Sequence, residues 1–115
     1  MAVQKKDLEI IEQVKNALDL KFGVDIIALD IRGISVMADY FVIATGNNTL
    51  QVKALADAAE EVLGRCGYPL RHSEGMQSAN WVLLDFGDII VHLFDKENRA
   101  FYNLERVWGD AKIIQ

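Results

Sequence analysis

Apolar residues recur at helical spacing in two long segments of the chain, with polar residues on the opposite side of each. The first segment covers residues 6–21, and Gly23 suits the position just past its end. Its apolar positions are Leu8, Ile11, Val14 and Leu18. The second segment follows Asn48, which resembles a capping box together with Gln51, and stops before Gly67. Its apolar stripe consists of Val52, Leu55, Ala56, Ala59, Val62, Leu63 and Cys66. Both segments predict amphipathic helices that pack on a core.

Shorter segments rich in apolar and β-branched residues predict strands. These segments are 25–31, 39–45, 70–72, 81–86 and 88–94. The turn at Phe86-Gly87-Asp88 joins the last two into an antiparallel hairpin, and the strands around the second helix form one parallel crossover. A final helix over 96–108 is expected to bury Phe101, Leu104 and Trp108. This order predicts a single α/β domain over residues 1–115, with a mixed five-stranded sheet flanked by helices.

Alternation along the strands divides their residues between two faces, because successive side chains point to opposite sides of a sheet. One set is wholly apolar and is expected to pack beneath the helices: Ile27, Leu29, Ile31, Phe41, Ile43, Val82, Leu84, Phe86, Ile89, Val91 and Leu93. The other set is mixed: Ala28, Asp30, Tyr40, Val42, Ala44, Trp81, Leu83, Asp85, Ile90, His92 and Phe94. Its polar members suit a dry core poorly, while its apolar members suit bare solvent poorly. Two interpretations stay open. Another helix covers this face and leaves the polar groups at its margins, or the part around Trp81 binds another protein.

The acidic charge of the chain narrows the range of partners. With 17 Asp and Glu against 12 Lys and Arg the net charge is −5, and the basic residues are scattered along the sequence. Proteins that bind nucleic acid place clustered Lys and Arg against phosphates, so direct specific nucleic-acid binding is not expected. An acidic domain favours a basic protein partner instead, because complementary charge raises association rates.

Cysteine content and hydropathy indicate a cytoplasmic protein. The chain has one cysteine, Cys66, which cannot form an internal disulfide and whose place in the apolar stripe suits a buried small hydrophobe. No apolar run has the length of a signal peptide or of a membrane span. We therefore expect a cytoplasmic location and no membrane partner.

Residues that could support catalysis occur singly or in turns. Asp85 and Asp88 lie three positions apart across a turn where Asp and Gly are favoured for backbone reasons, whereas Asp-x-Asp would place two carboxylates on one face to hold a cation. Gly46-Asn47-Asn48 before a helix is explained by capping more simply than by anion binding. Neither His72 nor His92 has a second ligand at metal spacing. The sequence predicts no catalytic, cofactor or metal site and no enzyme.

Two groups of segments, in this order and spacing, resemble one known family. In the first half they are Asp39-Tyr40-Phe41-Val42-Ile43-Ala44-Thr45-Gly46-Asn47, Gln51-Val52 and Ala56-Asp57. In the second half they are Glu74-Gly75, Trp81-Val82-Leu83-Leu84-Asp85-Phe86-Gly87-Asp88, Val91-His92, Arg99-Ala100-Phe101-Tyr102-Asn103-Leu104-Glu105 and Trp108. The resemblance, which runs over about 25–111, is to the ribosomal silencing factor family, RsfS or Iojap-like.

The resemblance implies a function in translation. Family members bind the large ribosomal subunit through ribosomal protein L-fourteen, sterically block association with the small subunit, and so repress translation. Some form homodimers, and organellar relatives act in ribosome assembly, so a large-subunit assembly factor is one alternative. The implied fold is nucleotidyltransferase-like, but the Gly-Ser and Asp-x-Asp signatures of active enzymes are absent from this sequence. A nucleotidyltransferase-like enzyme is therefore the weaker alternative.

Six residues are expected to contribute to binding of the ribosomal protein: Glu74, Trp81, Asp85, His92, Tyr102 and Glu105. Trp81 would be an aromatic anchor, and the acidic side chains would steer a basic partner. Tyr102, one helical turn before Glu105, would add an aromatic contact and a hydroxyl hydrogen bond. For His92 two alternatives stay open. If it faces the partner, binding weakens between about pH 7.5 and 6, and if it is buried and hydrogen-bonded, binding stays constant.

Overall fold

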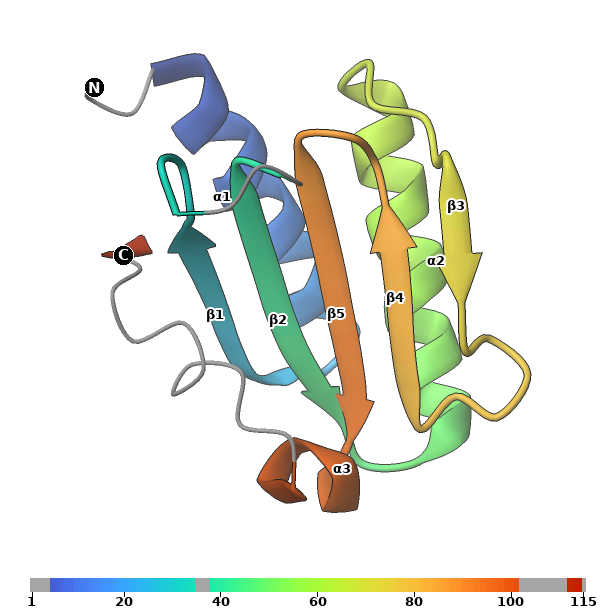
Figure 1. Cartoon of the computed structure of the whole chain (residues 1–115). Helices are drawn as coiled ribbons and strands as arrows, with labels where there is room; N and C mark the ends of the chain where they lie inside the picture. Colours follow the sequence, from blue (N-terminus) through green and yellow to red (C-terminus); the bar gives the residue numbers. More distant parts are fainter. Residues whose placement is uncertain (1–4, 35–37, 102–111, 115) are drawn as a thin grey trace.

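A computed structural model of the chain describes residues 5–34, 38–101 and 112–114, which form three helices and one mixed sheet. The helices are α1 (Lys5–Leu20), α2 (Thr49–Arg65) and α3 (Lys96–Phe101). The strands are β1 (Val24–Asp30), β2 (Tyr40–Gly46), β3 (His72–Glu74), β4 (Trp81–Asp85), β5 (Ile89–Asp95) and β6 (Lys112–Ile114). Figure 1 shows α1 and α2 side by side on one face of the sheet, with α3 at the end where β2 and β5 finish. The predicted α/β fold is confirmed.

The two long helices form for the reasons their sequences indicate. Asn48 caps α2, since its Oδ1 accepts the N–H of Gln51 at 2.9 Å. The reciprocal bond of the expected capping box is shifted by one residue, because Gln51 Oε1 accepts the N–H of Asn47 at 2.6 Å. The buried residues of α2 are Val52, Leu55, Ala56, Ala59, Val62 and Leu63, as predicted. Cys66, just past the helix, is only half-buried rather than buried.

In α1 the buried stripe differs by one residue from the expected one. Ile11, Val14 and Leu18 are buried, but Leu8 is 40% exposed and Ile10 contributes to the core in its place. Ile10 and Val14 are one turn apart and therefore share a face of the helix. The N–H of Gly23 donates to the carbonyl of Leu18 at 3.0 Å and helps to close the helix. None of the helices in the described part of the chain is long and apolar enough to cross a membrane.

In the described part of the chain the sheet has the order β3-β4-β5-β2-β1-β6, with six strands rather than the five expected. The additional strand, β6, pairs antiparallel with β1 through three residues, too few for a hydrophobic pattern to identify. β2 and β5 pair in parallel, and every other neighbouring pair is antiparallel. β3 begins two residues later than predicted, and it runs in the same direction as β2, so the expected crossover through α2 is present (Figure 1).

The assignment of residues to the two faces is correct for β4 and β5 and wrong for β1 and β2. Beneath the helices lie Ala28, Val42, Ala44, Val82, Leu84, Ile89, Val91 and Leu93. The opposite face, called here the outer face, has its buried centre at Leu29, Ile31, Phe41, Ile43, Ile90 and Phe94. The parallel register of β2 and β5 determines which residues of β2 lie on the outer face. Phe41 pairs with Ile90 and Ile43 pairs with His92, and paired residues point to the same side. Hydrophobicity could not decide it, since both alternating sets in β1 and β2 are largely apolar.

The predicted last helix is described only as α3, whose Asp95 cap accepts the N–H of Asn98 at 2.8 Å. The rest of the predicted helix, residues 102–108, lies outside the described part of the chain. The predicted burial of Phe101, Leu104 and Trp108 therefore stays a prediction, since the surroundings of these three side chains are not described. The predicted partner-binding residues Tyr102 and Glu105 also lie outside the described part.

Candidate functional site

Four of the six predicted binding residues lie on the outer face. Trp81 pairs with Phe94, and Asp85 pairs with Ile90. Leu83 pairs with His92 on one side and with Glu74 on the other. Because paired residues share a face, Glu74, Trp81, Asp85 and His92 lie on the same side of the sheet, opposite α1 and α2.

Most of the outer face is closed to solvent. Leu29, Ile43 and Phe94 on three of its strands are each at most 1% exposed. One accessible part lies over β4 and β3, where Trp81 is 36% exposed, Leu83 is half-buried and Glu74 is exposed. At the opposite margin Ile113 of β6, which pairs with Leu29, is also exposed. The two interpretations of the mixed face therefore apply to different parts of it. The centre is core, and the margin at Trp81 is open.

Trp81 is held between two aromatic neighbours. Its ring stacks on Phe94 with centroids 5.2 Å apart and an interplanar angle of 25°. Its indole Nε1–H donates to Nδ1 of His92 at 3.2 Å. The His92 ring in turn meets Phe41 edge-on, with centroids 4.7 Å apart. The indole thus has a fixed plane and a fixed edge while more than a third of its surface stays accessible, as suits an interface anchor.

His92 is buried, at 5% exposure, so it does not face a partner directly. Burial lowers its pKa to about 4, so the imidazole is neutral at physiological pH. One of its nitrogens accepts the bond from Trp81, but the other, Nε2, has no hydrogen-bond partner among the described residues. Of the two alternatives for this residue, the structure favours the buried one, with the difference that only half of its hydrogen-bonding capacity is used.

This buried imidazole predicts a pH dependence of stability. Because the folded pKa lies below the unfolded value near 6.5, the unfolded chain binds more protons between these values. Stability is therefore fully present above pH 6.5 and decreases as the pH falls toward 4. We expect the free energy of unfolding to drop by about 1 kcal/mol between about pH 7.5 and 5.5 through this residue alone. Denaturant titrations should show that drop in the wild type and not in His92→Phe, and equal pH slopes in the two proteins would contradict it.

The two acidic residues on this face have different surroundings. The carboxylate of Glu74 lies 3.4 Å from His72 Nε2, but both side chains are well exposed, so the pair adds little stability. Asp85 is half-buried, and its Oδ1 accepts the N–H of Gly87 at 2.8 Å, which fixes the β4–β5 turn. This turn role is the one the sequence favoured over a cation site. Among the described residues no group of three His, Cys, Asp or Glu could hold a metal ion.

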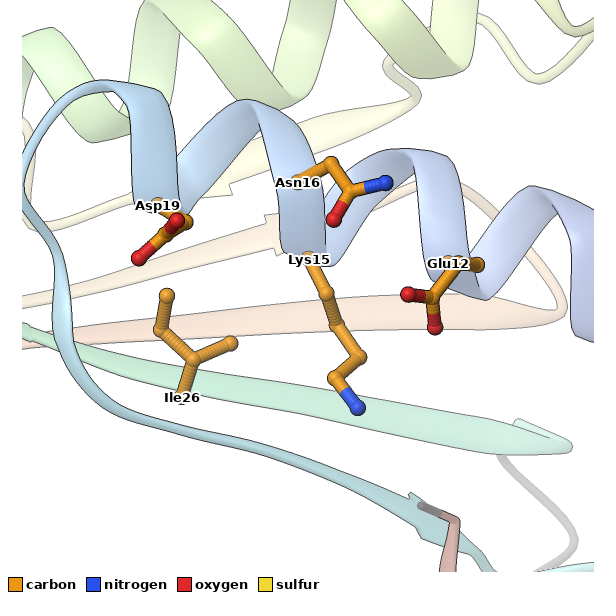
Figure 2. A pocket seen from close by; sticks show the side chains of 5 residues that line it. All are labelled: Glu12, Lys15, Asn16, Asp19 and Ile26. Carbon is orange, nitrogen blue, oxygen red and sulfur yellow. The ribbon is translucent and has the colours of Figure 1, made fainter.

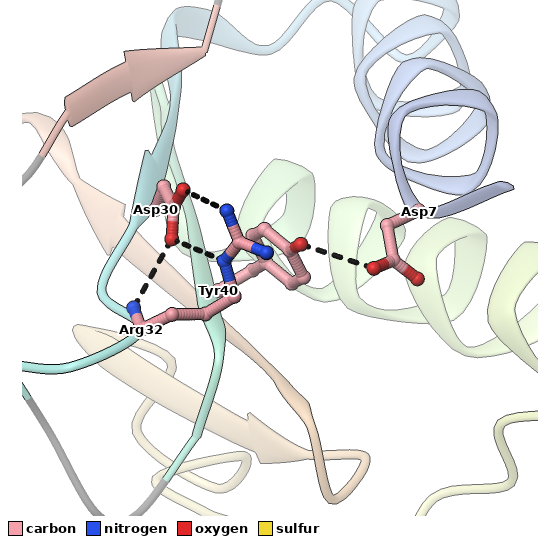
Figure 3. Close-up of polar contacts among 4 residues, drawn as sticks. All are labelled: Asp7, Asp30, Arg32 and Tyr40. Carbon is pink, nitrogen blue, oxygen red and sulfur yellow. Dashed lines mark hydrogen bonds and ion pairs between the residues drawn. The ribbon is translucent and has the colours of Figure 1, made fainter. Parts of the chain in front are cut away.

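An ion-pair network that the sequence analysis missed surrounds Asp30 (Figure 3). Arg32 binds both oxygens of Asp30, with Nε–Oδ1 at 2.9 Å and Nη2–Oδ2 at 2.8 Å. The same guanidinium lies 5.7 Å from the ring centroid of Tyr40, whose hydroxyl donates to Asp7 of α1 at 3.0 Å. Burial, aided by Asp7, raises the pKa of Tyr40 to about 12. The sequence offered one signal for this ion pair, because Asp30 and Arg32 have opposite charges and lie two positions apart at the end of a strand. The network ties α1 to the sheet at the end away from Trp81.

A shallow hollow lies between α1 and β1 (Figure 2). Its volume is about 220 Å³, and its lining is Glu12, Lys15, Asn16, Asp19 and Ile26. The acidic and amide side chains are exposed, while Lys15 reaches toward the carbonyl of Ile114 at 3.5 Å. Nothing in this lining combines burial with a free polar group, so the hollow has the character of ordinary surface.

Comparison with known proteins gives one consistent result. The family model described as "Ribosomal silencing factor during starvation" (RsfS) matches residues 4–115. The chain is similar to the ribosomal silencing factor RsfS of Halalkalibacterium halodurans, at 42% identity over 93% of this chain and 92% of that protein. It is also similar to that of Bacillus subtilis, at 46% identity over 84% and 82%. The chloroplastic protein Iojap of Arabidopsis thaliana is 35% identical over 91% of this chain and 43% of its own length.

Solved structures agree with the sequence relatives. A crystal structure of a protein from Bacillus halodurans has a TM-score of 0.79 at 38% identity, covering 93% of this chain and 97% of that one. A crystal structure of a protein from Chromobacterium violaceum has a TM-score of 0.82 at 38% identity, covering 88% and 84%.

Proposed function

The chain belongs to the ribosomal silencing factor family, whose members are ribosome-associated regulators of translation, and from this premise we propose how it acts. It binds the large ribosomal subunit in the cytoplasm through ribosomal protein L-fourteen and sterically blocks association with the small subunit. The family name denotes a regulatory factor, and the proposed action needs no catalytic step.

The observation that carries this proposal is the setting of Trp81. A large aromatic side chain that is 36% exposed, stacked on Phe94 and hydrogen-bonded to His92 has little freedom left to lose on binding. Rigid, partly exposed aromatic residues are frequent energetic centres of protein interfaces. Trp81 lies on β4, one strand from the short edge strand β3, so a partner can approach it from the side of the sheet.

Charge supports a basic partner for this surface. The net charge of the chain is −5, and Glu74 stands exposed on β3 on the same face as Trp81. Ribosomal proteins carry much positive charge, because they bind RNA phosphates. Glu74 and Asp85 would therefore steer the encounter, while the apolar contact at Trp81 would hold the complex together.

We expect added salt to slow association with large subunits more than it speeds dissociation. Exposed charges act over a distance that shortens as ionic strength rises, whereas a packed aromatic contact is insensitive to salt. Stopped-flow or surface-based kinetics at about one and three times physiological salt should show the effect. Glu74→Gln should reduce the salt dependence, and Glu60→Gln, an exposed residue of α2 on the other side of the sheet, should leave it unchanged. An association rate that does not respond to salt would contradict electrostatic steering.

Capture by purified ribosomal particles tests the proposed function. The immobilised protein should retain isolated large subunits and isolated ribosomal protein L-fourteen, and should not retain small subunits. Retention of small subunits alone, or of neither particle, would overturn the proposal. A marked preference for immature over mature large subunits would instead indicate the alternative role in assembly.

A further inference from the structure

We infer that His92 is a positioning residue, whose Nδ1 holds the indole of Trp81 in the orientation that binds the partner; this inference rests on the proposed docking role of Trp81.

His92 occupies a place where a histidine has no evident structural advantage. Its strand neighbours are Ile43 and Leu83, and its ring neighbours are aromatic. At 5% exposure it leaves Nε2 buried and, within the described part of the chain, without a hydrogen-bond partner. An apolar ring of similar size would fill the same space without burying an unpaired polar atom. A residue that breaks a local packing rule next to a candidate binding residue points to a role other than stability.

The hydrogen bond fixes which nitrogen of His92 carries the proton. An indole Nε1–H can only donate, so Nδ1 at 3.2 Å must be the unprotonated acceptor. The proton of the neutral imidazole is then on Nε2, for which no described residue is a hydrogen-bond partner. Burial lowers the pKa of His92 to about 4, so the imidazole stays neutral through the physiological range and Nδ1 stays an acceptor for Trp81. The unpaired Nε2–H is therefore the consequence of keeping an acceptor directed at Trp81.

The bond adds a directional restraint to the stacking. The contact with Phe94, at an interplanar angle of 25°, sets the plane of the indole. The bond from Nε1 to Nδ1 of His92 sets the direction of the ring edge within that plane, while 36% of the Trp81 surface stays exposed. A side chain ordered before binding loses less conformational entropy on binding. His92 contributes this order from below the surface, without touching the partner.

The test removes the acceptor while keeping the packing. His92→Phe keeps an aromatic ring, His92→Leu is a second acceptor-free variant, and His92→Asn restores an acceptor oxygen near the position of Nδ1. The affinity of each for purified large subunits is measured beside its melting temperature. We expect His92→Phe to weaken binding about fivefold, the effect of one neutral hydrogen bond, with a melting temperature equal to or above that of the wild type. His92→Asn should recover part of the affinity.

Two further readouts separate positioning from a structural role. The indole N–H resonance of Trp81, assigned by its absence in Trp81→Phe, should move and exchange faster with solvent in His92→Phe and His92→Leu. In a Trp81→Phe background, which has no N–H to hold, His92→Phe should cause no further loss of affinity. Unchanged affinity in both acceptor-free variants, or additive losses in the double variant, would overturn the positioning role and leave the proposed function standing. A wild-type protein that does not bind large subunits would overturn both.

Discussion

Trp81→Ala is expected to weaken binding to the large subunit by about 2 kcal/mol, roughly thirtyfold, while the chain stays folded. The indole is the accessible end of a cluster whose other members are buried, so truncation removes the contact that a partner can reach. The fold should persist because the face beneath the helices is untouched. Some stability will be lost, since Trp81 also stacks on Phe94 and bonds to His92. Circular dichroism and a binding assay on the same sample measure both effects.

Leu50→Ala is the matched control for this change. Leu50 is also a large apolar residue, 79% exposed, but it lies in the first turn of α2, away from the outer face. Its truncation should alter neither affinity nor stability to a measurable degree. Equal affinity of Trp81→Ala and wild type would place the interface elsewhere, and unfolding of Trp81→Ala would identify Trp81 as core.

Gly75→Ala is expected to destabilise the fold by about 3 kcal/mol and to weaken binding as well. Gly75 has φ +83°, and a Cβ there would collide with the backbone carbonyl oxygen of Trp81. The carbonyl of Gly75 also accepts a hydrogen bond from the N–H of Ala79 at 2.8 Å, and this bond closes the loop that leads into β4. A methyl group must therefore push the first residue of β4 out of register with Phe94. Chemical denaturation and the capture assay measure the two losses.

Gly64→Ala provides the opposite result as a control. Gly64 lies within α2, and a Cβ there meets nothing within 4 Å. Alanine in a helix should raise stability by up to about 1 kcal/mol and leave binding unchanged. Wild-type stability in Gly75→Ala would show that the loop adapts and does not fix Trp81.

The two long helices and the hairpin could be predicted because their sequences specify them at several levels at once. In α2 the apolar stripe and the Asn48 cap agree, and in the hairpin the Asp85–Gly87 turn agrees with the alternation on both sides. The shared face of Trp81 and His92 also follows from alternation, given the hairpin register. Their hydrogen bond does not follow, because it depends on rotamers set by packing against Phe41 and Phe94.

Prediction failed where two arrangements satisfy the same pattern. In β1 and β2 either alternating set could face the helices, and the small residues Ala28 and Ala44, rather than the larger apolar ones, lie beneath them. Only pairing between strands far apart in the sequence distinguishes the two arrangements. The binding role of the acidic residues stays a prediction, since charge on an exposed side chain such as Glu74 has many explanations.

Subunit joining is the most direct measure of the proposed action. Purified large and small subunits are mixed at a Mg²⁺ concentration that favours joining, without added nucleotide, and separated by sedimentation with and without the protein. The proposal predicts that the protein migrates with free large subunits and that the joined fraction falls as its concentration rises, with Trp81→Ala much less effective at equal concentration. A joined fraction that stays constant while large subunits are saturated with the protein would contradict it.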